Sequence, residues 1–397
     1  MLSDRARPIV KATLPVVGRH IEEIADRFYA HMFAAHPEFQ DGLFNRGNQK
    51  EGSQPKALAG SVAVFASALL ADPPQFPDRL LTRVAHKHAS LGIRPDQYRV
   101  VHKHLMWAIG DVLGDAVTPE VAAAWNEVYW LMAYALIHQE RGLYSARGVA
   151  PERVWRQWRV AGKVHETDEV VTFVMRRIDD RPVKTSLPGQ YVSVMVRMPD
   201  GVRQPRQYSL VRADDGEHRY FAVKRVDRGE VSHFLHDAVH VGDELTMSVP
   251  YGDVVLDDGG RPVVFASAGI GVAPMAGMIS HLVTAGSHLE VTVLHADAEE
   301  RTFPLRRQLA EDLAQLPKSN LYVWYENGPE TDLPVTGVFG GTMNLGQAEL
   351  PEDAVYYLCG PLPFLQAVRG ELIGRGISPA DIQYEMFGPD LWQADRE

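Results

Sequence analysis

Two histidines separated by one residue are the first side chains in the sequence that could bind a metal. His86 and His88 lie in the segment RLLTRVAHKHASLG (79–92), where Leu80, Val84 and His88 recur at steps of four. Residues at that spacing share one face of a helix, so His88 extends an apolar stripe and His86 points elsewhere. Most histidines on an apolar face are ordinary core residues, but imidazole is also the commonest metal ligand in proteins. The spacing therefore selects His88 over His86 as the candidate ligand.

A carboxylate in a later helical segment offers what such a histidine needs. Glu140 follows Met132 by eight residues and Leu136 by four, which places it on an apolar stripe. A buried carboxylate requires a partner, and a ligating histidine requires a hydrogen bond to its second ring nitrogen. We therefore predict that Glu140 pairs with His88. The alternative is that Glu140 reaches solvent beside the end of its helix.

Helical periodicity runs through residues 1–147 and would provide the scaffold for this pair. Ser53 before Pro55 and Thr118 before Pro119 are typical helix starts. We expect six or seven helices and no strand in this block. Its apolar stripes are formed by Ile21, Ile24, Phe28 and Met32, by Leu58, Val62, Phe65 and Leu69, and by Trp125, Val128, Met132 and Leu136.

The pattern changes twice after residue 147. A Gly/Pro linker at 148–151 is followed, between 152 and 257, by short runs rich in β-branched and aromatic residues that turn residues separate. Such runs are typical of an antiparallel barrel or sandwich. From 260 to 397, strand-like runs alternate with helical segments, which indicates a parallel α/β sheet. The sequence thus predicts three domains: all-α over 1–147, an antiparallel β-barrel over 152–257, and α/β over 260–397.

Composition limits the classes of protein to which the chain can belong. Its 397 residues are 45% hydrophobic and 23% charged with a formal net charge of −11, which argues against nucleic-acid partners and a polybasic membrane patch. The single cysteine, Cys359, excludes a cysteine-held iron–sulfur cluster and favours a reducing compartment. The N-terminus has no apolar signal core, and glycines interrupt the uncharged stretch 262–279. We expect a cytoplasmic monomer without a membrane span.

Segments of the helical block resemble the globin domain of flavohaemoglobins, in the family's order. They are FYAHMF (28–33), LFNRGNQ (43–49), SQPKAL (53–58), HKHASLGIRPDQY (86–98) and IHQERGLY (137–144). The resemblance implies that His88 is the proximal iron ligand of haem b, with Tyr98 and Glu140 as its hydrogen-bonded partners. On the distal side it implies Tyr29, Gln54, Leu58 and Phe44, with Phe44 packing against the porphyrin.

Tyr29 is the most informative of the distal residues. Tyrosines are common in protein cores, but a hydroxyl on an apolar face requires a hydrogen-bond partner. The oxygen ligand of a haem would be such a partner. Gln54 is either a second donor or a polar residue near a helix start.

The run RQYSL (206–210) resembles the flavin-binding R-x-Y-S strand of the ferredoxin–NADP⁺ reductase-like superfamily. The resemblance implies an FAD site at Arg206, Gln207, Tyr208 and Ser209. The chemistry is consistent with it, because an arginine can pair with a diphosphate, a tyrosine can pack on a flavin ring, and a serine can bond near its N5 atom. The alternative is an ordinary amphipathic strand.

Two further segments match the flavin module of that superfamily. PGQY (188–191) implies that Tyr191 contacts the adenine end of FAD. RGEVSHFLH (228–236) resembles the phosphate-binding turn and helix, which implies roles for Gly229, Val231 and Ser232. Arg228 departs from the pattern, because flavohaemoglobins usually have a glycine there. This departure puts the geometry of the loop in question.

The α/β block contains a glycine-rich turn between a strand and a helix. In ASAGIGVAPM (266–275), Gly269 and Gly271 would let a dinucleotide phosphate approach the backbone, with Pro274 and Met275 following. The superfamily usually has threonine where this chain has Ala273. Two later segments also resemble the superfamily: CGP, with Cys359, Gly360 and Pro361, and EMFGP (385–389). They imply that Cys359 lies near the nicotinamide, that Phe387 shields the flavin, and that Glu385 lies between flavin and haem. Cys359 is otherwise a small buried apolar residue.

The choice between NADH and NADPH depends on the residues after the second strand of this block. Asp297 follows that strand, and an acid there disfavours a ribose 2′-phosphate. Arg301, Arg306 and Arg307 are nearby and argue the other way. We expect NADH as the coenzyme, with NADPH as the alternative.

The order of the three blocks is that of flavohaemoglobins over essentially the whole chain. The resemblance implies a nitric oxide dioxygenase that converts NO and O2 to nitrate with electrons passed from NAD(P)H through FAD to haem. The same parts could instead serve an NADH oxidase or a hydroperoxide reductase. A third hypothesis is an oxygen-binding or oxygen-sensing globin whose reductase keeps the iron ferrous, and a reductase with a haem-free helical partner is a fourth.

Overall fold

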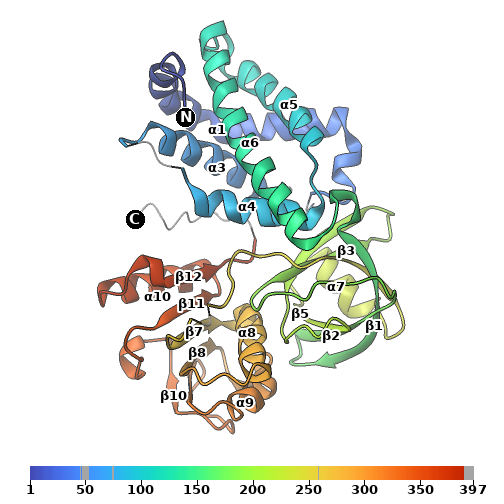
Figure 1. Cartoon of the computed structure of the whole chain (residues 1–397), viewed down its shortest axis with the longest axis vertical. Coiled ribbons are helices and arrows are strands. Elements are labelled where there is room, and N and C mark those ends of the chain that lie inside the picture. Colours follow the sequence, from blue (N-terminus) through green and yellow to red (C-terminus); the bar gives the residue numbers. More distant parts are fainter. Residues whose placement is uncertain (45, 47–52, 74–75, 258, 389–397) are drawn as a thin grey trace. The chain divides into compact units, whose positions relative to one another are not determined.

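The computed structural model describes residues 1–44, 46, 53–73, 76–257 and 259–388, without the side chains of 53–57 and 59 (Figure 1). Contacts divide the chain into two compact units. One contains residues 1–156 together with 195–206, and the other contains 157–194 together with 207–388. None of the described helices combines the length and the apolar character needed to cross a membrane.

The N-terminal block is helical, as its periodicity predicts. Its described α-helices are α1 (Ala6–Ala35), α3 (Ser53–Leu70), α4 (Asp78–Leu91), α5 (Pro95–Leu113) and α6 (Pro119–Arg147), with short 3₁₀ turns at η1 (Pro37–Gln40) and η2 (Gly114–Ala116). Thr118 caps α6 as expected, since its side chain accepts a bond from the Val121 N–H. Ser53 is the first residue of its helix rather than the cap before it. Among the described residues of this block there is no strand.

The three predicted apolar stripes meet in one core. Phe28, Phe65 and Trp125 come from three different helices and are each almost completely buried. The Trp125 indole N–H donates to the Thr13 hydroxyl at 3.0 Å, so the polar atom of this large side chain keeps a partner. Burial of such aromatic groups stabilises the packing of α1, α3 and α6 around this core.

The second block is an antiparallel sheet. Its strands are β1 (Trp155–His165), β2 (Val170–Arg177), β3 (Tyr191–Arg197), β4 (Arg203–Ser209), β5 (His218–Lys224) and β6 (Glu244–Ser248), in the order β4-β3-β6-β1-β2-β5, and α7 spans Glu230–Asp237. An antiparallel bridge joins Leu210, just after β4, to Phe221 in β5. The two outer strands of the order therefore meet, which is how a sheet closes on itself.

The third block is a parallel sheet with helices. It contains β7 (Val263–Ala268), β8 (Val291–Asp297), β9 (Ser319–Tyr325), β10 (Gly337–Gly340), β11 (Val355–Cys359) and β12 (Ile382–Glu385), in the order β10-β9-β8-β7-β11-β12. The helices are α8 (Val272–Thr284), α9 (Arg306–Leu313) and α10 (Leu362–Gly374). All strand pairs are parallel, and α8 packs against α9 while α10 contacts β11 (Figure 1). Five of these strands, β7, β8, β9, β11 and β12, coincide with strand-like runs of the sequence, which are PVVFASA, LEVTVLHA, LYVWYEN, AVYYLCG and IQYEMF. The four-residue edge strand β10 was not predicted.

The departure at Arg228 leaves the backbone in the conformation that a glycine would favour. Its φ is +56°, in the left-handed region, where a side chain costs about 1 kcal/mol. The side chain is 93% exposed, and its charged partner Asp227 is 96% exposed. The loop geometry is thus compatible with arginine at a small energetic cost.

Replacement of Arg228 by glycine should therefore stabilise the chain. We expect the free energy of unfolding to rise by about 0.5–1 kcal/mol, because the strain at a positive φ disappears. Chemical denaturation of the flavin-free protein measures this change. Arg181→Gly is the control, since Arg181 is an exposed arginine outside the positive-φ set and its replacement should not stabilise. An unchanged or lower stability of Arg228→Gly would contradict the argument.

Candidate functional site

His88, Tyr98 and Glu140 converge from α4, α5 and α6 on one hydrogen-bonded cluster. The Nδ1 atom of His88 lies 2.8 Å from Glu140 Oε1 and 3.0 Å from the Tyr98 hydroxyl, which itself donates to Glu140 Oε1 at 2.5 Å. Because a carboxylate only accepts hydrogen bonds, His88 carries its proton on Nδ1 and presents Nε2 as the ligating atom. Glu140 is 2% exposed, so the alternative in which it reaches solvent is wrong.

Burial also keeps one member of this cluster, Tyr98, in a defined protonation state. Burial raises the pKa of Tyr98, and the adjacent Glu140 carboxylate raises it further. The phenol therefore stays protonated and remains a donor to the carboxylate. The Tyr129 hydroxyl donates to the backbone carbonyl of Tyr98 at 2.6 Å and helps to hold this part of α5 in place. Nothing in the helical periodicity marked Tyr129 for this role.

The face of α4 that carries His88 differs from the one we expected. The helix buries Leu81, Ala85 and Ala89 against the core, whereas Leu80, Val84 and His88 are only half-buried. Both sets of residues are spaced four apart, so each shares one face of the helix. The periodicity therefore identified the stripe through His88 but could not tell which of the two faces is buried. A half-buried apolar face that ends in a histidine suits contact with a flat apolar group better than contact with a neighbouring helix.

The predicted distal residues occupy α1, α3 and the segment after η1. Tyr29 is 6% exposed, and its ring lies 4.7 Å from that of Phe28, 5.6 Å from that of Phe33 and 5.8 Å from that of Phe44. Leu58 and Phe44 are partly buried against the same core as Tyr29. Gln54 lies in the first turn of α3, but its side chain is outside the described residues.

The run RQYSL lies at the end of β4, where Arg206, Gln207 and Tyr208 are half-buried and the next two residues are buried. The Tyr208 ring stacks on Phe221 at 5.2 Å, and the Gln207 amide donates to the Ser193 hydroxyl at 2.9 Å. Arg206 donates to the carbonyl of Pro205 at 2.8 Å.

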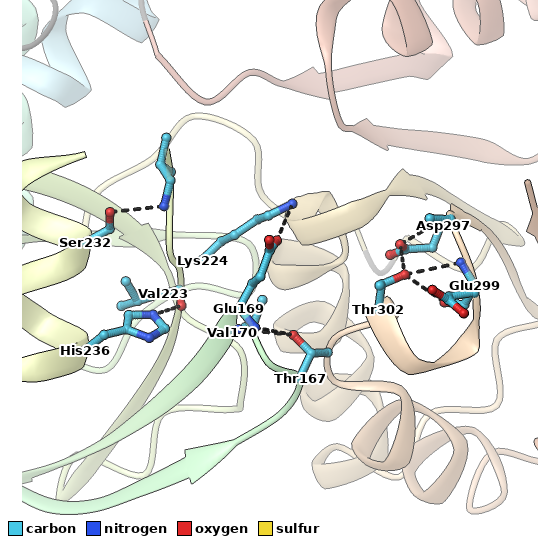
Figure 2. Close-up of polar contacts among 12 residues, drawn as sticks. Thr167, Glu169, Val170, Val223, Lys224, Ser232, His236, Asp297, Glu299 and Thr302 are labelled. Carbon is cyan, nitrogen blue, oxygen red and sulfur yellow. Dashed lines mark hydrogen bonds and ion pairs between the residues drawn. The ribbon is translucent and has the colours of Figure 1, made fainter. Parts of the chain in front are cut away.

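The turn before α7 is organised around Ser232, which is labelled in Figure 2. Its hydroxyl accepts a bond from the Val226 N–H at 3.1 Å and donates to the Gly229 carbonyl at 3.1 Å. A Cβ on Gly229 would lie 2.6 Å from that hydroxyl, so only glycine fits there. Val231 is buried beneath the turn. Tyr191 in β3 is also buried and is bridged to Tyr251 through the backbone.

The two glycine motifs of the α/β block meet at the carboxyl ends of β7 and β11. A Cβ on Gly271 would lie 2.2 Å from the Cys359 carbonyl oxygen, and one on Gly360 would lie 2.7 Å from the Phe364 ring. Gly269 has a φ of +53°. Carboxyl ends of parallel strands beside a glycine turn form the usual nucleotide site of such sheets.

The remaining predicted residues surround this point. Pro274 and Met275 are buried in the first turns of α8, and Pro361 precedes α10. Cys359 is fully buried, and burial raises the pKa of its thiol with a further contribution from Glu385, its partner across β11 and β12. A thiol kept protonated is a small apolar residue rather than a nucleophile. Phe387 is 48% exposed, as a side chain that covers a planar ligand would be.

Three family models match the chain in sequence order. The globin model matches residues 26–136, the oxidoreductase FAD-binding domain model 158–255, and the oxidoreductase NAD-binding domain model 265–370. The Flavohemoprotein of Rhizobium meliloti (strain 1021) is 38% identical over 408 residues, which cover 99% of this chain and 100% of that protein. The Flavohemoprotein of Deinococcus radiodurans is 40% identical over 397 residues, covering 98% of each. The chain belongs to the flavohemoprotein family.

Solved structures agree with this assignment. The flavohemoglobin of Malassezia yamatoensis with bound FAD and haem is 37% identical, has a TM-score of 0.90 and covers 98% of this chain and 100% of that one. The FAD/NAD-binding domain of nitric oxide dioxygenase from Vibrio cholerae is 35% identical with a TM-score of 0.55, over 59% of this chain and 99% of that one. The predicted fold class is confirmed: a globin, then an antiparallel FAD domain and a parallel-sheet NAD domain.

The residues present in this flavohemoprotein fit a haem. Nδ1 of His88 is taken by Glu140 and Tyr98, and the adjoining face of α4 is apolar and half-buried. A porphyrin needs a single nitrogen donor with an apolar surface beside it, and this donor set provides both. The arrangement differs from a structural metal site, which requires several protein ligands.

Three side chains in the NAD domain form a buried hydrogen-bonded row that was not predicted from the sequence. The Ser267 hydroxyl lies 2.9 Å from His295 Nδ1, and His295 Nε2 lies 3.4 Å from the Asp297 carboxylate. Ser267 and His295 are fully buried, and the His295 ring stacks on Phe303 at 3.7 Å. The pairing of β7 with β8 aligns Ser267 with His295, so strand register would have been the signal.

A second buried histidine, in the helical block, leads to a testable prediction about the stability of the fold at acid pH. His104 is 1% exposed, its Nδ1 lies 3.0 Å from that of His31, and its Nε2 has no partner within the described residues. Burial lowers the pKa of His104, and the charges of His31, His36 and Lys103 lower it further. The folded chain therefore binds this proton less readily than the unfolded chain, whose histidines titrate near 6.5. The free energy of unfolding is therefore unaffected by His104 above pH ~6.5, and it decreases as the pH falls below that value because the unfolded chain takes up the proton more readily.

His104→Gln should flatten this pH dependence. Thermal unfolding followed by helical circular dichroism at pH 7.5, 6.5 and 5.5 should show that the free energy of unfolding falls less with decreasing pH in the variant than in the unmodified chain. Glutamine can still bond to His31 but does not titrate. His240→Gln is the control, because His240 is 75% exposed. Equal pH slopes for His104→Gln and the unmodified chain would show that His104 does not contribute.

Proposed function

We propose that this flavohemoprotein is a nitric oxide dioxygenase, converting NO and O2 to nitrate with electrons passed from NAD(P)H through FAD to haem b. The observation that carries the proposal is the His88–Glu140–Tyr98 cluster within a chain that also has FAD- and NAD-binding domains. The V. cholerae relative, a nitric oxide dioxygenase, supports the same activity. The haem, when bound, supplies the redox-active iron at which O2 and NO meet.

On the proximal side, we assign His88 as the iron ligand and Glu140 and Tyr98 as positioning residues. The carboxylate accepts the Nδ1 proton of His88, which fixes the tautomer and increases the electron donation of the other nitrogen. Tyr98 donates to the same carboxylate oxygen, so Glu140 remains an acceptor with a fixed direction. A strongly donating imidazole is what His88 would supply to a bound haem.

On the distal side, Tyr29 is the proposed hydrogen-bond donor to the reacting oxygen, with Gln54 as a second donor. The rings of Phe28, Phe33 and Phe44 surround Tyr29 and exclude water from its neighbourhood. A hydrogen bond in an apolar setting is stronger than in water. Leu58 and Phe44 would pack on the porphyrin.

In the reductase, two groups of residues would hold the flavin and the nicotinamide. FAD, when bound, turns the two-electron hydride donor into two single-electron deliveries. The proposed FAD residues are Tyr191, Arg206, Gln207, Tyr208, Ser209, Gly229, Val231, Ser232, Glu385 and Phe387. The proposed coenzyme residues are Gly269, Gly271, Pro274, Met275, Cys359, Gly360 and Pro361. The domain boundaries at 1–147, 152–257 and 260–397, a monomeric state and a cytoplasmic location are part of the same proposal.

Product analysis tests the activity. With the purified holoenzyme, NADH, O2 and NO, we expect roughly two nitrate ions per NADH, because each hydride supplies two electrons and each nitrate requires one. Nitrate is measured by ion chromatography and NO with an electrode. Accumulation of superoxide or peroxide while NO persists would overturn the proposal in favour of an NADH oxidase. Tight oxygen binding without nitrate would favour the oxygen-binding globin.

A further inference from the structure

The segment after β8 contains an acid that is turned inward. The Asp297 side chain is 10% exposed, and its carboxylate accepts a bond from the Thr302 hydroxyl at 2.5 Å (Figure 2). It also accepts a bond from the Ala298 N–H at 2.8 Å and lies 3.4 Å from His295 Nε2. An acid at the end of the second strand of such a sheet commonly binds the ribose hydroxyls of the coenzyme. Asp297 is instead committed to holding the segment together. Another group must therefore decide whether a 2′-phosphate is accepted.

The next acid, Glu299, points to an arginine rather than into the fold. Its carboxylate lies 2.8 Å from Arg301, whose side chain is 73% exposed, while that of Glu299 is 32% exposed. Glu299 is also held in place, because its side chain accepts a bond from the Thr302 backbone N–H in a capping box. Arg301 is thus an exposed cation in the turn after β8, and it forms an ion pair with the carboxylate of Glu299.

The other charges of the segment do not offer a phosphate an alternative. Arg306 is 20% exposed, lies 3.8 Å from Glu300 and donates to the Phe303 carbonyl at 3.2 Å. Arg307 is exposed at the start of α9, and its contribution is measured below. A phosphate dianion brought to the loop itself would face the carboxylates of Glu299 and Glu300, whereas a ribose hydroxyl would carry no charge to be repelled.

We propose that Glu299 is a specificity-determining residue that neutralises Arg301 and so excludes the 2′-phosphate of NADPH, which makes NADH the coenzyme. The inference rests on the coenzyme site assigned above. To that site it adds the coenzyme that is accepted and the residue that determines the choice. Arg301 would serve as a phosphate ligand only when the carboxylate opposite it is removed.

The test is a charge-removal cycle. Reduction of the bound flavin by NADH and by NADPH is followed anaerobically in a stopped-flow instrument, and the second-order rates give a NADPH/NADH ratio. Glu299→Gln should raise this ratio about fivefold, which is the scale expected when one exposed charge near a phosphate is removed. Gln keeps the acceptor of the capping box, and a thermal melt verifies that the domain is folded. In Glu299→Gln/Arg301→Gln the gain should disappear.

Matched controls and a binding measurement make the outcome decisive. Glu311→Gln and Arg307→Gln change exposed charges on α9 and should leave the ratio unaltered. Calorimetric binding of NAD⁺ and NADP⁺ should show the same shift as the kinetic ratio in Glu299→Gln. An unchanged ratio in Glu299→Gln, or a lower ratio in the single variants Arg301→Gln or Arg307→Gln, would overturn the proposal. Flavin reduction does not involve NO, so this result is independent of whether the holoenzyme makes nitrate.

Discussion

Replacing His88 by alanine should leave a protein that oxidises NADH at its flavin but neither retains haem nor consumes NO. The variant removes the nitrogen that Glu140 and Tyr98 orient, and the half-buried apolar face of α4 remains without its ligand. We expect the Soret absorption of the purified protein to be lost and NO consumption to fall more than about 100-fold, as for removal of a metal ligand. NADH-dependent reduction of ferricyanide should persist, because it requires only the reductase.

The neighbouring histidine provides the control for this result. His86→Ala lies on the same helix, two residues away, and should keep the haem spectrum and the NO-consuming activity. The NO-consuming activity of Glu140→Gln should fall between those of His88→Ala and His86→Ala, because haem stays bound but its histidine ligand donates electrons less strongly. If the His88→Ala protein shows the same haem absorption as the unmodified protein, the assignment of the proximal ligand is wrong. Loss of folding is recognised separately, by helical circular dichroism.

The pairing of His88 with Glu140 could be predicted because helical phase is a local property. Residues four apart share a face whatever the tertiary fold, so Leu136 and Glu140, or Val84 and His88, could be grouped from sequence alone. Burial is not local in this sense. The stripe through Leu80, Val84 and His88 is half-buried while the adjacent face is the buried one, and both are apolar in the sequence.

Interactions that depend on strand register could not be predicted in the same way. Ser267 meets His295, and Gln207 meets Ser193, because their strands pair with a particular alignment. A shift by one residue would turn each side chain to the opposite face of its sheet. The ion pair of Arg219 with Asp214, with both side chains 1% exposed, could not be predicted for a different reason. The sequence shows two ordinary charged residues near a turn, and only the closed barrel explains why they are buried.

The contact between the two glycine motifs leads to the second large effect. A Cβ on Gly271 would lie 2.2 Å from the Cys359 carbonyl oxygen, 2.6 Å from its carbon and 2.9 Å from the Cα of Gly360. These are all backbone atoms, so no flexible side chain can move aside. Gly271→Ala must displace the turn between β7 and α8 from the end of β11. We expect the rate of flavin reduction by NADH to fall more than about 100-fold, since a displacement of this size ruins positioning.

A glycine in α10 serves as the comparison for this variant. No atom lies within 4 Å of a Cβ on Gly370, and this residue is inside a helix, so Gly370→Ala should raise stability by about 0.5–1 kcal/mol and leave NADH oxidation intact. Stopped-flow flavin reduction and thermal melts of both variants measure the two effects. The Soret band of Gly271→Ala should be unchanged, because the substitution lies outside the helical unit. Normal flavin reduction by Gly271→Ala would mean that the turn can move without harm, and that close packing of the two motifs is not what positions the coenzyme.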